Sequence, residues 1–290
     1  MMNLLRRRAL MIAAQVDKPI PVLYGVTSTT YNGTVPGIYK IDINTGIETL
    51  LNGTVKSYSS ICDLGNEKLL VGVNASSSTT GLLFILDLKT LTLTGLTTNV
   101  VINAPRGLWH SPLDKKIYMC SSENVKIVDP LTGVVTACTY DWYGHTILVD
   151  DADHYYSDYS GQIKKYLKST NADRGSIITT NSIQHYGLAW YKNKLLTIPS
   201  DSTGNQLMLI DPTTKDSWIR YIFPQFSVGS IGSTGNILVV KDDRIFFACR
   251  NVSGAVTSNR IWELDEATLT ITARSSTSQN WKGICAPYLL

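Results

Sequence analysis

A unit of four short apolar segments recurs along this chain, and it constrains the fold more than any other feature. Each unit opens with a small residue, usually glycine, followed by apolar residues. The openings fall at Ser59, Gly107, Gly144, Gly187, Gly235 and Gly283, so successive spacings are 48, 37, 43, 48 and 48 residues. Self-similarity at a period of about 20–50 residues is typical of repeat architectures, in which each repeat is one supersecondary unit.

Within a unit, the segments have the composition of β-strands. A second apolar run follows each opening, as in LLVGVN from Leu69, and a third often ends in Asp before a Thr-containing turn, as in YKIDINTG. A fourth, short run follows, as in LTITARS. The runs are rich in Ile, Leu, Val, Thr and Tyr and are separated by Gly, Asn, Asp or Pro, which is the strand signature. Four antiparallel strands every 40–50 residues or so match one blade of a β-propeller.

The two ends of the chain complete one such unit between them. After Gly283 the remaining residues suffice for a first strand only. The three other strands of that unit stand at the beginning, as LYGVTS from Leu23, GIYKIDI from Gly37 and IETLL from Ile47. We therefore predict an all-β, six-bladed β-propeller over residues 21–290, with four antiparallel strands per blade. One blade is closed by strands from both termini, which leaves no open edge in the ring.

An aspartate recurs at the turn between the third and fourth strands of the unit. These residues are Asp42, Asp87, Asp129, Asp211 and Asp265. Because Asp accepts backbone N–H bonds in such turns, the repetition favours a scaffold role over a metal role. The fourth unit has KYLKSTNADRG instead, and there we expect a longer and more mobile turn.

Composition excludes several classes of protein. A chain of 290 residues with 43% hydrophobic content can bury a large core, and a net charge of +3 is too small and dispersed for nucleic-acid binding. No apolar run approaches the roughly 18 residues that a transmembrane helix needs. The five cysteines are scattered within apolar segments without metal-type spacing, which favours a reducing compartment. They are Cys62, Cys120, Cys138, Cys249 and Cys285.

Residues 1–20 lie outside the repeats and begin MMNLLRRRALMIAAQ. As a helix, this arm would place Leu5, Leu10 and Ile12 near one another, with Arg6, Arg7 and Arg8 offset. Such a segment suits an anchor that docks onto a larger assembly. A disordered arm and a cleaved export signal, for which the apolar run is short, are the alternatives.

The repeat alignment predicts which side chains meet at the central channel. In a propeller the first strand of each blade lines the channel, so the residues just before it sit at one mouth. We predict that the ligand-binding ring there consists of Tyr58, Arg106, Trp142, Tyr143, His185, Tyr186, Trp281 and Lys282. Tyr and Trp offer an apolar face with a polar handle, and the two cations could orient a carboxylate or phosphate. The alternative is that these bulky residues plug the channel and pack between blades.

Catalytic features are weak by comparison. Of the four histidines only His185 and His145 fall near the predicted mouth, while His110 and His154 fall elsewhere. The acidic run VDDADHYYSD does not have the spacing of an EF-hand loop. The repeated Ser-x-Asp-x-Gly-x-x-x-Trp turn of sialidases and the Glu-Gly-Pro motif of sugar lactonases are absent. We therefore predict a non-catalytic module without metal or cofactor. A hydrolase or lyase acting on a small polar substrate at the channel mouth is the alternative.

Two resemblances bear on function. The turns with Asp-Pro followed by Thr, as in IVDPLTG and LIDPTT, resemble those of YVTN- and NHL-type propeller repeats. This class is functionally mixed, so the resemblance implies the fold and no particular activity. The opening LLRRRALMIAAQ is similar to N-terminal arms of structural proteins in tailed phages of gut bacteria. It implies a virion protein, made in the bacterial cytoplasm and anchored to other virion proteins through the arm, whose propeller meets a surface glycan or protein receptor. A cytoplasmic protein or intracellular scaffold is the alternative.

Overall fold

The computed structural model describes most of the repeat region. The described residues are 22–28, 35–54, 57–73, 83–100, 102, 105–111, 113–121, 124–137, 144–149, 154–159, 161–179, 184–200, 205–223, 226–227, 237–251, 258–277, 279 and 281–287. Residues 1–20, where the predicted anchor residues Leu5, Arg6, Arg7, Arg8, Leu10 and Ile12 fall, lie outside them.

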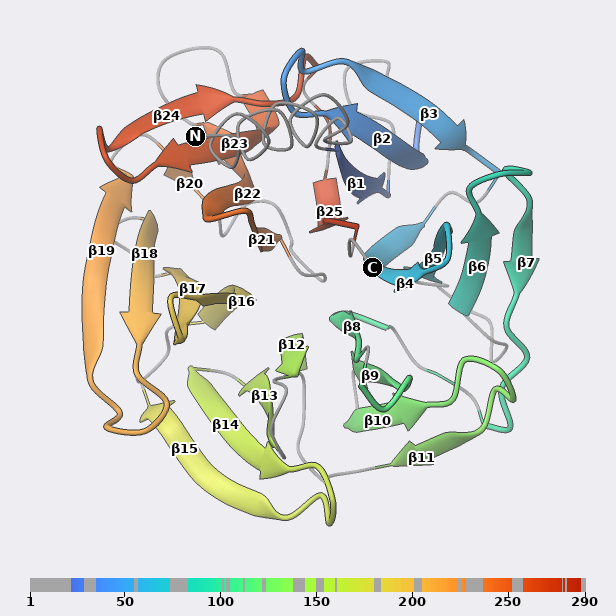
Figure 1. Cartoon of the computed structure of the whole chain (residues 1–290), viewed down its shortest axis with the longest axis horizontal. Coiled ribbons are helices and arrows are strands. Elements are labelled where there is room, and N and C mark those ends of the chain that lie inside the picture. Colours follow the sequence, from blue (N-terminus) through green and yellow to red (C-terminus); the bar gives the residue numbers. More distant parts are fainter. Residues whose placement is uncertain are drawn as a thin grey trace, which may run out of the picture.

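The described strands form six antiparallel sheets arranged around a central axis (Figure 1). The sheet shared by the two ends of the chain has the order β25 (Trp281–Cys285), β1 (Val22–Thr27), β2 (Ile38–Asp42) and β3 (Glu48–Asn52). The next two sheets hold β4 (Tyr58–Gly65), β5 (Lys68–Val73), β6 (Leu83–Asp87) and β7 (Leu93–Gly95), then β8 (Leu108–His110), β9 (Ile117–Cys120), β10 (Val125–Val128) and β11 (Val135–Ala137).

The other three sheets continue the ring in chain order. They hold β12 (Gly144–Val149), β13 (His154–Tyr159), β14 (Gln162–Leu167) and β15 (Asp173–Thr179); β16 (Gln184–Tyr191), β17 (Lys194–Ser200), β18 (Asn205–Ile210) and β19 (Ser217–Phe223); and β20 (Phe226–Ser227), β21 (Leu238–Lys241), β22 (Arg244–Asn251), β23 (Ser258–Asp265) and β24 (Thr270–Ala273). The predicted all-β propeller class is confirmed, and each sheet is one blade.

The ring closes through pairing between the two ends of the chain. Strand β25 runs antiparallel to β1, with Tyr24 opposite Cys285 and Val26 opposite Gly283. The blade that the sequence divides between its ends is therefore a continuous sheet, as predicted. The short strand β20 was not predicted; it pairs with the end of β22, on the same edge of β22 as β21.

The small residue that opens the repeat has a steric cause. The innermost strands of neighbouring blades converge near the axis, so their backbones approach closely. A Cβ on Gly107 of the β8 blade would lie 2.6 Å from Cα of Thr146 on β12. A Cβ on Gly283 would lie 3.3 Å from Cα of Ser60 on β4. Glycine is therefore required at Gly107, while at Gly283 a Cβ would force its neighbour to shift by a few tenths of an ångström.

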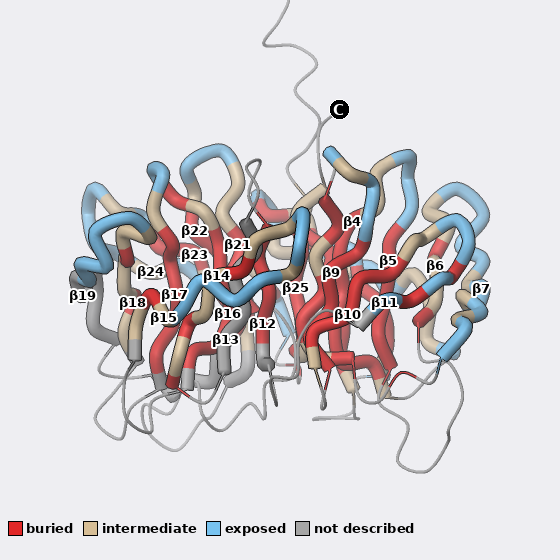
Figure 2. Tube along the Cα trace, turned by 90° about the horizontal axis from the view of Figure 1, so that it is seen from below, coloured by how far each residue is buried: buried red, intermediate tan, exposed pale blue. Residues whose placement is uncertain are grey.

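Side chains from the two faces of each sheet fill the spaces between blades. The buried aliphatic residues include Leu23, Leu69, Ile117 and Leu195, all 0% exposed. Figure 2 shows that burial is concentrated in the middle of the strands, while the turns at one face of the disc are exposed. Packing between twisted sheets, and not pairing of strands, therefore joins one blade to the next.

The recurring aspartate holds the turn between third and fourth strands. In the β10–β11 turn, Oδ1 of Asp129 accepts hydrogen bonds from the backbone N–H groups of Leu131 (2.8 Å) and Thr132 (3.0 Å). Asp42, Asp87, Asp211 and Asp265 accept the equivalent pairs. The scaffold interpretation of these residues is confirmed.

The expectation of a longer turn in the fourth unit is wrong. The N–H of Asn171 donates to the carbonyl of Leu167 (2.7 Å), and Leu167 N–H donates to Ala172 (3.0 Å), the same backbone bonds that close the aspartate turns. Asn171 supplies the left-handed residue with a φ of 57°. Because Asn tolerates this conformation, the turn keeps its length without the aspartate.

Candidate functional site

The predicted ring lies at the end of the innermost strands where the chain enters them. Its described aromatic and histidine side chains are buried: Tyr58 and Trp281 are 1% exposed, His185 0% and Tyr186 8%. Trp281 packs edge-on against Tyr39, with ring centroids 5.8 Å apart. Nδ1 of His185 lies 3.4 Å from Oγ1 of Thr197, and burial lowers the histidine pKa to about 4. Tyr58, Tyr186 and Trp281 belong to apolar clusters that join residues of neighbouring blades, as the packing alternative anticipates.

The remaining ring residues are less enclosed or lie outside the described residues. Arg106 and Lys282 are half-buried, and burial lowers the pKa of Lys282. Trp142 and Tyr143 lie outside the described residues. The ligand-binding role assigned to the ring therefore stays a prediction.

A cavity of about 290 Å³ occupies the opposite end of the channel. It is lined by residues of five innermost strands, β4, β8, β16, β21 and β25, and of the segments that follow β21 and β25. The lining residues are 61–63, 108–110, 189–190, 238–242 and 284–287. The cavity lies at the end of the channel where tight hairpin turns connect the first and second strands of the blades. In the β4–β5, β16–β17 and β21–β22 turns, both central residues have positive φ. Such two-residue turns hold the strand ends rigidly, so the cavity has a well-defined wall.

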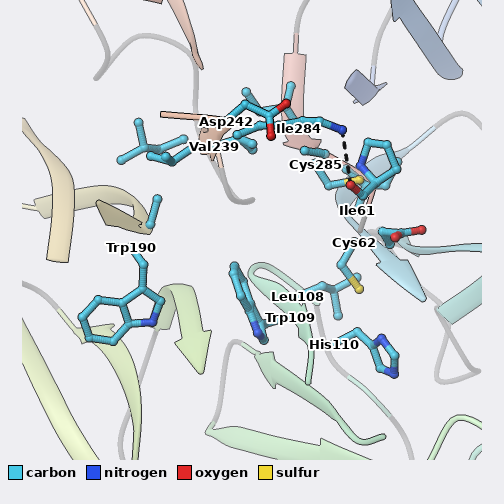
Figure 3. A pocket seen from close by; sticks show the side chains of 17 residues that line it. Ile61, Cys62, Leu108, Trp109, His110, Trp190, Val239, Asp242, Ile284 and Cys285 are labelled. Carbon is cyan, nitrogen blue, oxygen red and sulfur yellow. Dashed lines mark hydrogen bonds between the residues drawn. The ribbon is translucent and has the colours of Figure 1, made fainter. Parts of the chain in front are cut away.

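Two tryptophans are among the residues that line this cavity. Trp109 comes from β8 and Trp190 from β16, and in Figure 3 the indole of Trp190 points away from Val239 and Ile284. Both indoles are half-buried and pack against the apolar cluster that contains Leu148 and Leu188. Aromatic rings held this way supply large contact area at little entropic cost.

The β4 and β8 strands meet at the cavity wall through two hydrogen bonds. The backbone N–H of His110 donates to the Cys62 sulfur, and the His110 imidazole donates to the backbone carbonyl of Asp63. All three residues are buried, at 7% exposure or less. Burial lowers the pKa of His110, so the ring is neutral at pH 7.

The thiols at this wall are poor nucleophiles. Burial, with a smaller contribution from the Asp63 charge, raises the pKa of the Cys62 and Cys285 thiols well above the ordinary value. Thiol reactivity requires the thiolate. The cavity thus presents its cysteines as small apolar surfaces.

Charged groups gather at the rim of the cavity. Lys241 is half-buried and its Nζ donates to the backbone carbonyl of Pro287 (3.4 Å), which ties β21 to the segment after β25. Asp242, in the adjacent turn, is exposed and lies near Val239 in Figure 3. Asp63 lies deeper, at 4% exposure. The interior is apolar, and its polar groups are few and placed at defined points, which is the usual character of a small-molecule site.

Two features are absent from the described residues. No three His, Cys, Asp or Glu side chains there are grouped so that they could hold a metal ion. The same part of the chain contains no helix with the length and apolarity needed to cross a membrane.

The sequence analysis missed this cavity because it considered only residues before the small opening residue. The innermost strand continues past that residue to the other end of the channel. Trp109 follows Gly107 by two positions and Trp190 follows Gly187 by three. The recurrence of a tryptophan two or three positions after the opening glycine in two repeats could have indicated that these residues lie at the same end of the channel. Which two of the repeats would place their indoles on one cavity was not apparent without the ring geometry.

Comparison with known proteins agrees with the propeller architecture. No family model matches the chain, and no curated protein matches its sequence. Among solved structures, a chain of a nidogen/laminin complex is similar with a TM-score of 0.71 at 8% identity, covering 92% of this chain and 98% of that one. Hydrazine synthase from Kuenenia stuttgartiensis is similar with a TM-score of 0.54 at 16% identity, covering 75% and 65%. At such identities the likeness shows the fold alone.

Proposed function

We propose that this propeller is a non-catalytic recognition module whose channel cavity holds a small part of a ligand. The observation that carries the proposal is the mainly apolar cavity at one end of the channel, which Trp109 and Trp190 help to line. A cavity of about 290 Å³ is near the lower limit of ligand pockets, roughly 300 Å³, so it suits one ring or one branched group. The raised pKa of both thiols and the neutral, hydrogen-bonded imidazole favour binding over nucleophilic chemistry at this wall.

The wider biological setting is part of the same proposal and rests on the sequence resemblances. Turns similar to YVTN and NHL repeats suit a rigid display scaffold, and the arm, similar to those of gut-phage structural proteins, suits attachment to virion proteins. In this setting the ligand is a surface glycan or protein of the host cell. Deleting residues 1–20 should abolish incorporation into particles while the propeller keeps its melting temperature. If the deletion left incorporation into particles unchanged, the proposal that residues 1–20 anchor the protein in a virion would be contradicted.

The test of recognition compares the two ends of the channel. The full chain is screened on a glycan array and on host-cell surfaces beside two double variants. Trp109→Leu/Trp190→Leu changes the cavity, and Arg106→Ala/Lys282→Ala changes the predicted mouth at the opposite end. We expect binding that the cavity variant loses and the mouth variant retains. The reverse pattern would move the site to the predicted ring, and a wild-type protein that binds nothing would contradict the recognition proposal.

A further inference from the structure

Strand β3 of the closing blade ends at an asparagine–glycine pair. Asn52 is the last residue of the strand, Gly53 follows it, and both are half-buried. In such a pair the backbone nitrogen of the glycine can attack the amide carbon of the asparagine side chain and close a five-membered succinimide ring. Glycine favours this attack because it has no side chain to hinder the approach. The reaction needs no nucleophile beyond these two residues.

The amide oxygen of Asn52 accepts two hydrogen bonds from one residue. Thr54 donates to Oδ1 through its hydroxyl (2.7 Å) and through its backbone N–H (3.1 Å). Bonds of this kind also stabilise turns, which is their structural role. When a nucleophile adds to the amide carbon, however, negative charge develops on this same oxygen. Donors about 2.7–3.1 Å away are placed to stabilise such an oxyanion.

The amide nitrogen of Asn52 links two blades. Nδ2 donates to the backbone carbonyl of Leu91 (3.4 Å), in the turn between β6 and β7 of the next blade. The distance is beyond the usual range for an N–H···O bond, so the bond holds this nitrogen only weakly. A carboxylate in place of the amide would lose the donor and would bring a negative charge near the Leu91 carbonyl oxygen. A change at Asn52 therefore alters the contact between the closing blade and its neighbour.

We propose that Asn52 deamidates spontaneously in the folded protein, with Gly53 as the nucleophile and Thr54 as the donor to the oxyanion. The bond between Gly53 N and Asn52 Cγ forms, and the attacking nitrogen gives its proton to solvent. The Cγ–Nδ2 bond breaks, and Nδ2 takes up a proton and leaves as ammonia. Water then opens the succinimide at either carbonyl, which leaves aspartate or isoaspartate at this position without oxidation or reduction. The inference goes beyond the proposed recognition function and does not depend on it.

The chain contains a sequence-matched control for this site. The four residues Asn-Gly-Thr-Val occur at 52–55 and again at 32–35, of which 32–34 lie outside the described residues. The full chain is incubated at mildly alkaline pH, both native and in guanidinium chloride. Peptide mass spectrometry and isoaspartyl methyltransferase labelling give the rate at each site. In guanidinium chloride the two sites should react at similar rates, because only the local sequence acts there. In the native protein Asn52 should react about tenfold faster than in guanidinium chloride.

Variants of the neighbouring residues assign the roles. Thr54→Val removes the hydroxyl donor and should slow native conversion of Asn52 by about tenfold, whereas Thr54→Ser keeps the donor and should retain the rate. Gly53→Ala should suppress the reaction, and the fold accepts it because the added Cβ would come no closer than 3.4 Å to its neighbours. Thr49→Val, at an exposed position of the same strand, is the matched control and should leave the rate unchanged.

Three results would overturn the proposal. The first is native conversion of Asn52 no faster than conversion in guanidinium chloride, since the fold would then give no acceleration. The second is an equal native rate in wild type and Thr54→Val, which would leave the hydroxyl with its structural role alone. The third is an equal loss of rate in Thr49→Val and Thr54→Val. The outcome of the glycan-array screen has no bearing on these rates, so the two proposals fail independently.

Discussion

The indole of Trp281 fills the space that Gly25 leaves beside it. A Cβ on Gly25 would lie 2.5 Å from Cζ3 and 2.7 Å from Cε3 of this ring. The two residues belong to β1 and β25, the strands that join the two ends of the chain. The contact therefore lies at the closure of the ring, to which Trp281 contributes.

Substitution of Gly25 by alanine should destabilise the propeller. The indole is 1% exposed and also packs on Tyr39, so it cannot move aside freely. Overpacking of this kind costs about 1–3 kcal/mol. Chemical denaturation followed by fluorescence measures the loss. Gly95→Ala is the control, because its Cβ would only reach ordinary contact, 3.7 Å from Phe84. Equal stability of the two variants would contradict the steric account.

Glu263 should contribute more to stability than an exposed ion pair. Its carboxylate accepts hydrogen bonds from Arg244 at 2.6 and 2.9 Å and also from Arg274, and it is 8% exposed. Burial alone would raise its pKa, but the bonds to Arg244 and Arg274 hold the pKa below its ordinary value. We expect Glu263→Gln to cost about 1–3 kcal/mol of unfolding free energy.

The matched comparison is Glu67→Gln, which removes the exposed pair with Lys89. In that pair the side chains are 58% and 71% exposed, so solvent screens the interaction and little stability should be lost. If Glu67→Gln lost more stability than Glu263→Gln, burial would not be what makes one carboxylate contribute more to stability than the other.

The Asp211 turn should make stability depend on pH in the acidic range. Its pKa is lowered to about 2 by the hydrogen bond from Lys194 and by two backbone N–H groups. A carboxylate with a folded pKa below the unfolded value stabilises the fold above the unfolded pKa, and this contribution is lost as pH falls toward the folded pKa. Asp211→Asn keeps an acceptor for the turn but removes the charge.

The difference in melting temperature between wild type and Asp211→Asn should therefore be positive at pH 6 and shrink between about pH 4 and pH 2. Thermal melts across this range measure it. A difference that stays constant with pH would mean that the charge of Asp211 contributes nothing to folding.

Alkylation should distinguish the native thiols from those of the unfolded chain. Since burial raises the pKa of Cys62 and Cys285, both should react at pH 8 far more slowly in the native protein than in guanidinium chloride. Site-resolved mass spectrometry after iodoacetamide treatment gives both rates. Rapid native labelling of Cys62 would indicate an activated thiol and would revive the catalytic alternative.

The sequence determined the fold because the repeat is a local property. Each glycine opening, strand composition and aspartate turn acts within one blade, and the split of the last unit between Gly283 and Leu23 required closure. The sequence also predicted, as an alternative to ligand binding, that bulky residues such as Tyr58, Tyr186 and Trp281 pack between blades. The length of the Leu167–Ala172 turn was misjudged because Leu167 stands where the other turns have aspartate, yet Asn171 takes the left-handed position and the backbone bonds are unchanged.

The candidate site, by contrast, was decided by tertiary structure alone. The indoles of Trp109 and Trp190 and the carboxylate of Asp63 come from three strands that are far apart in the sequence. No local pattern states at which end of the channel a cavity forms. That depends on how the side chains of neighbouring inner strands share the space around the axis, and such packing is a property of the closed ring and of no single repeat.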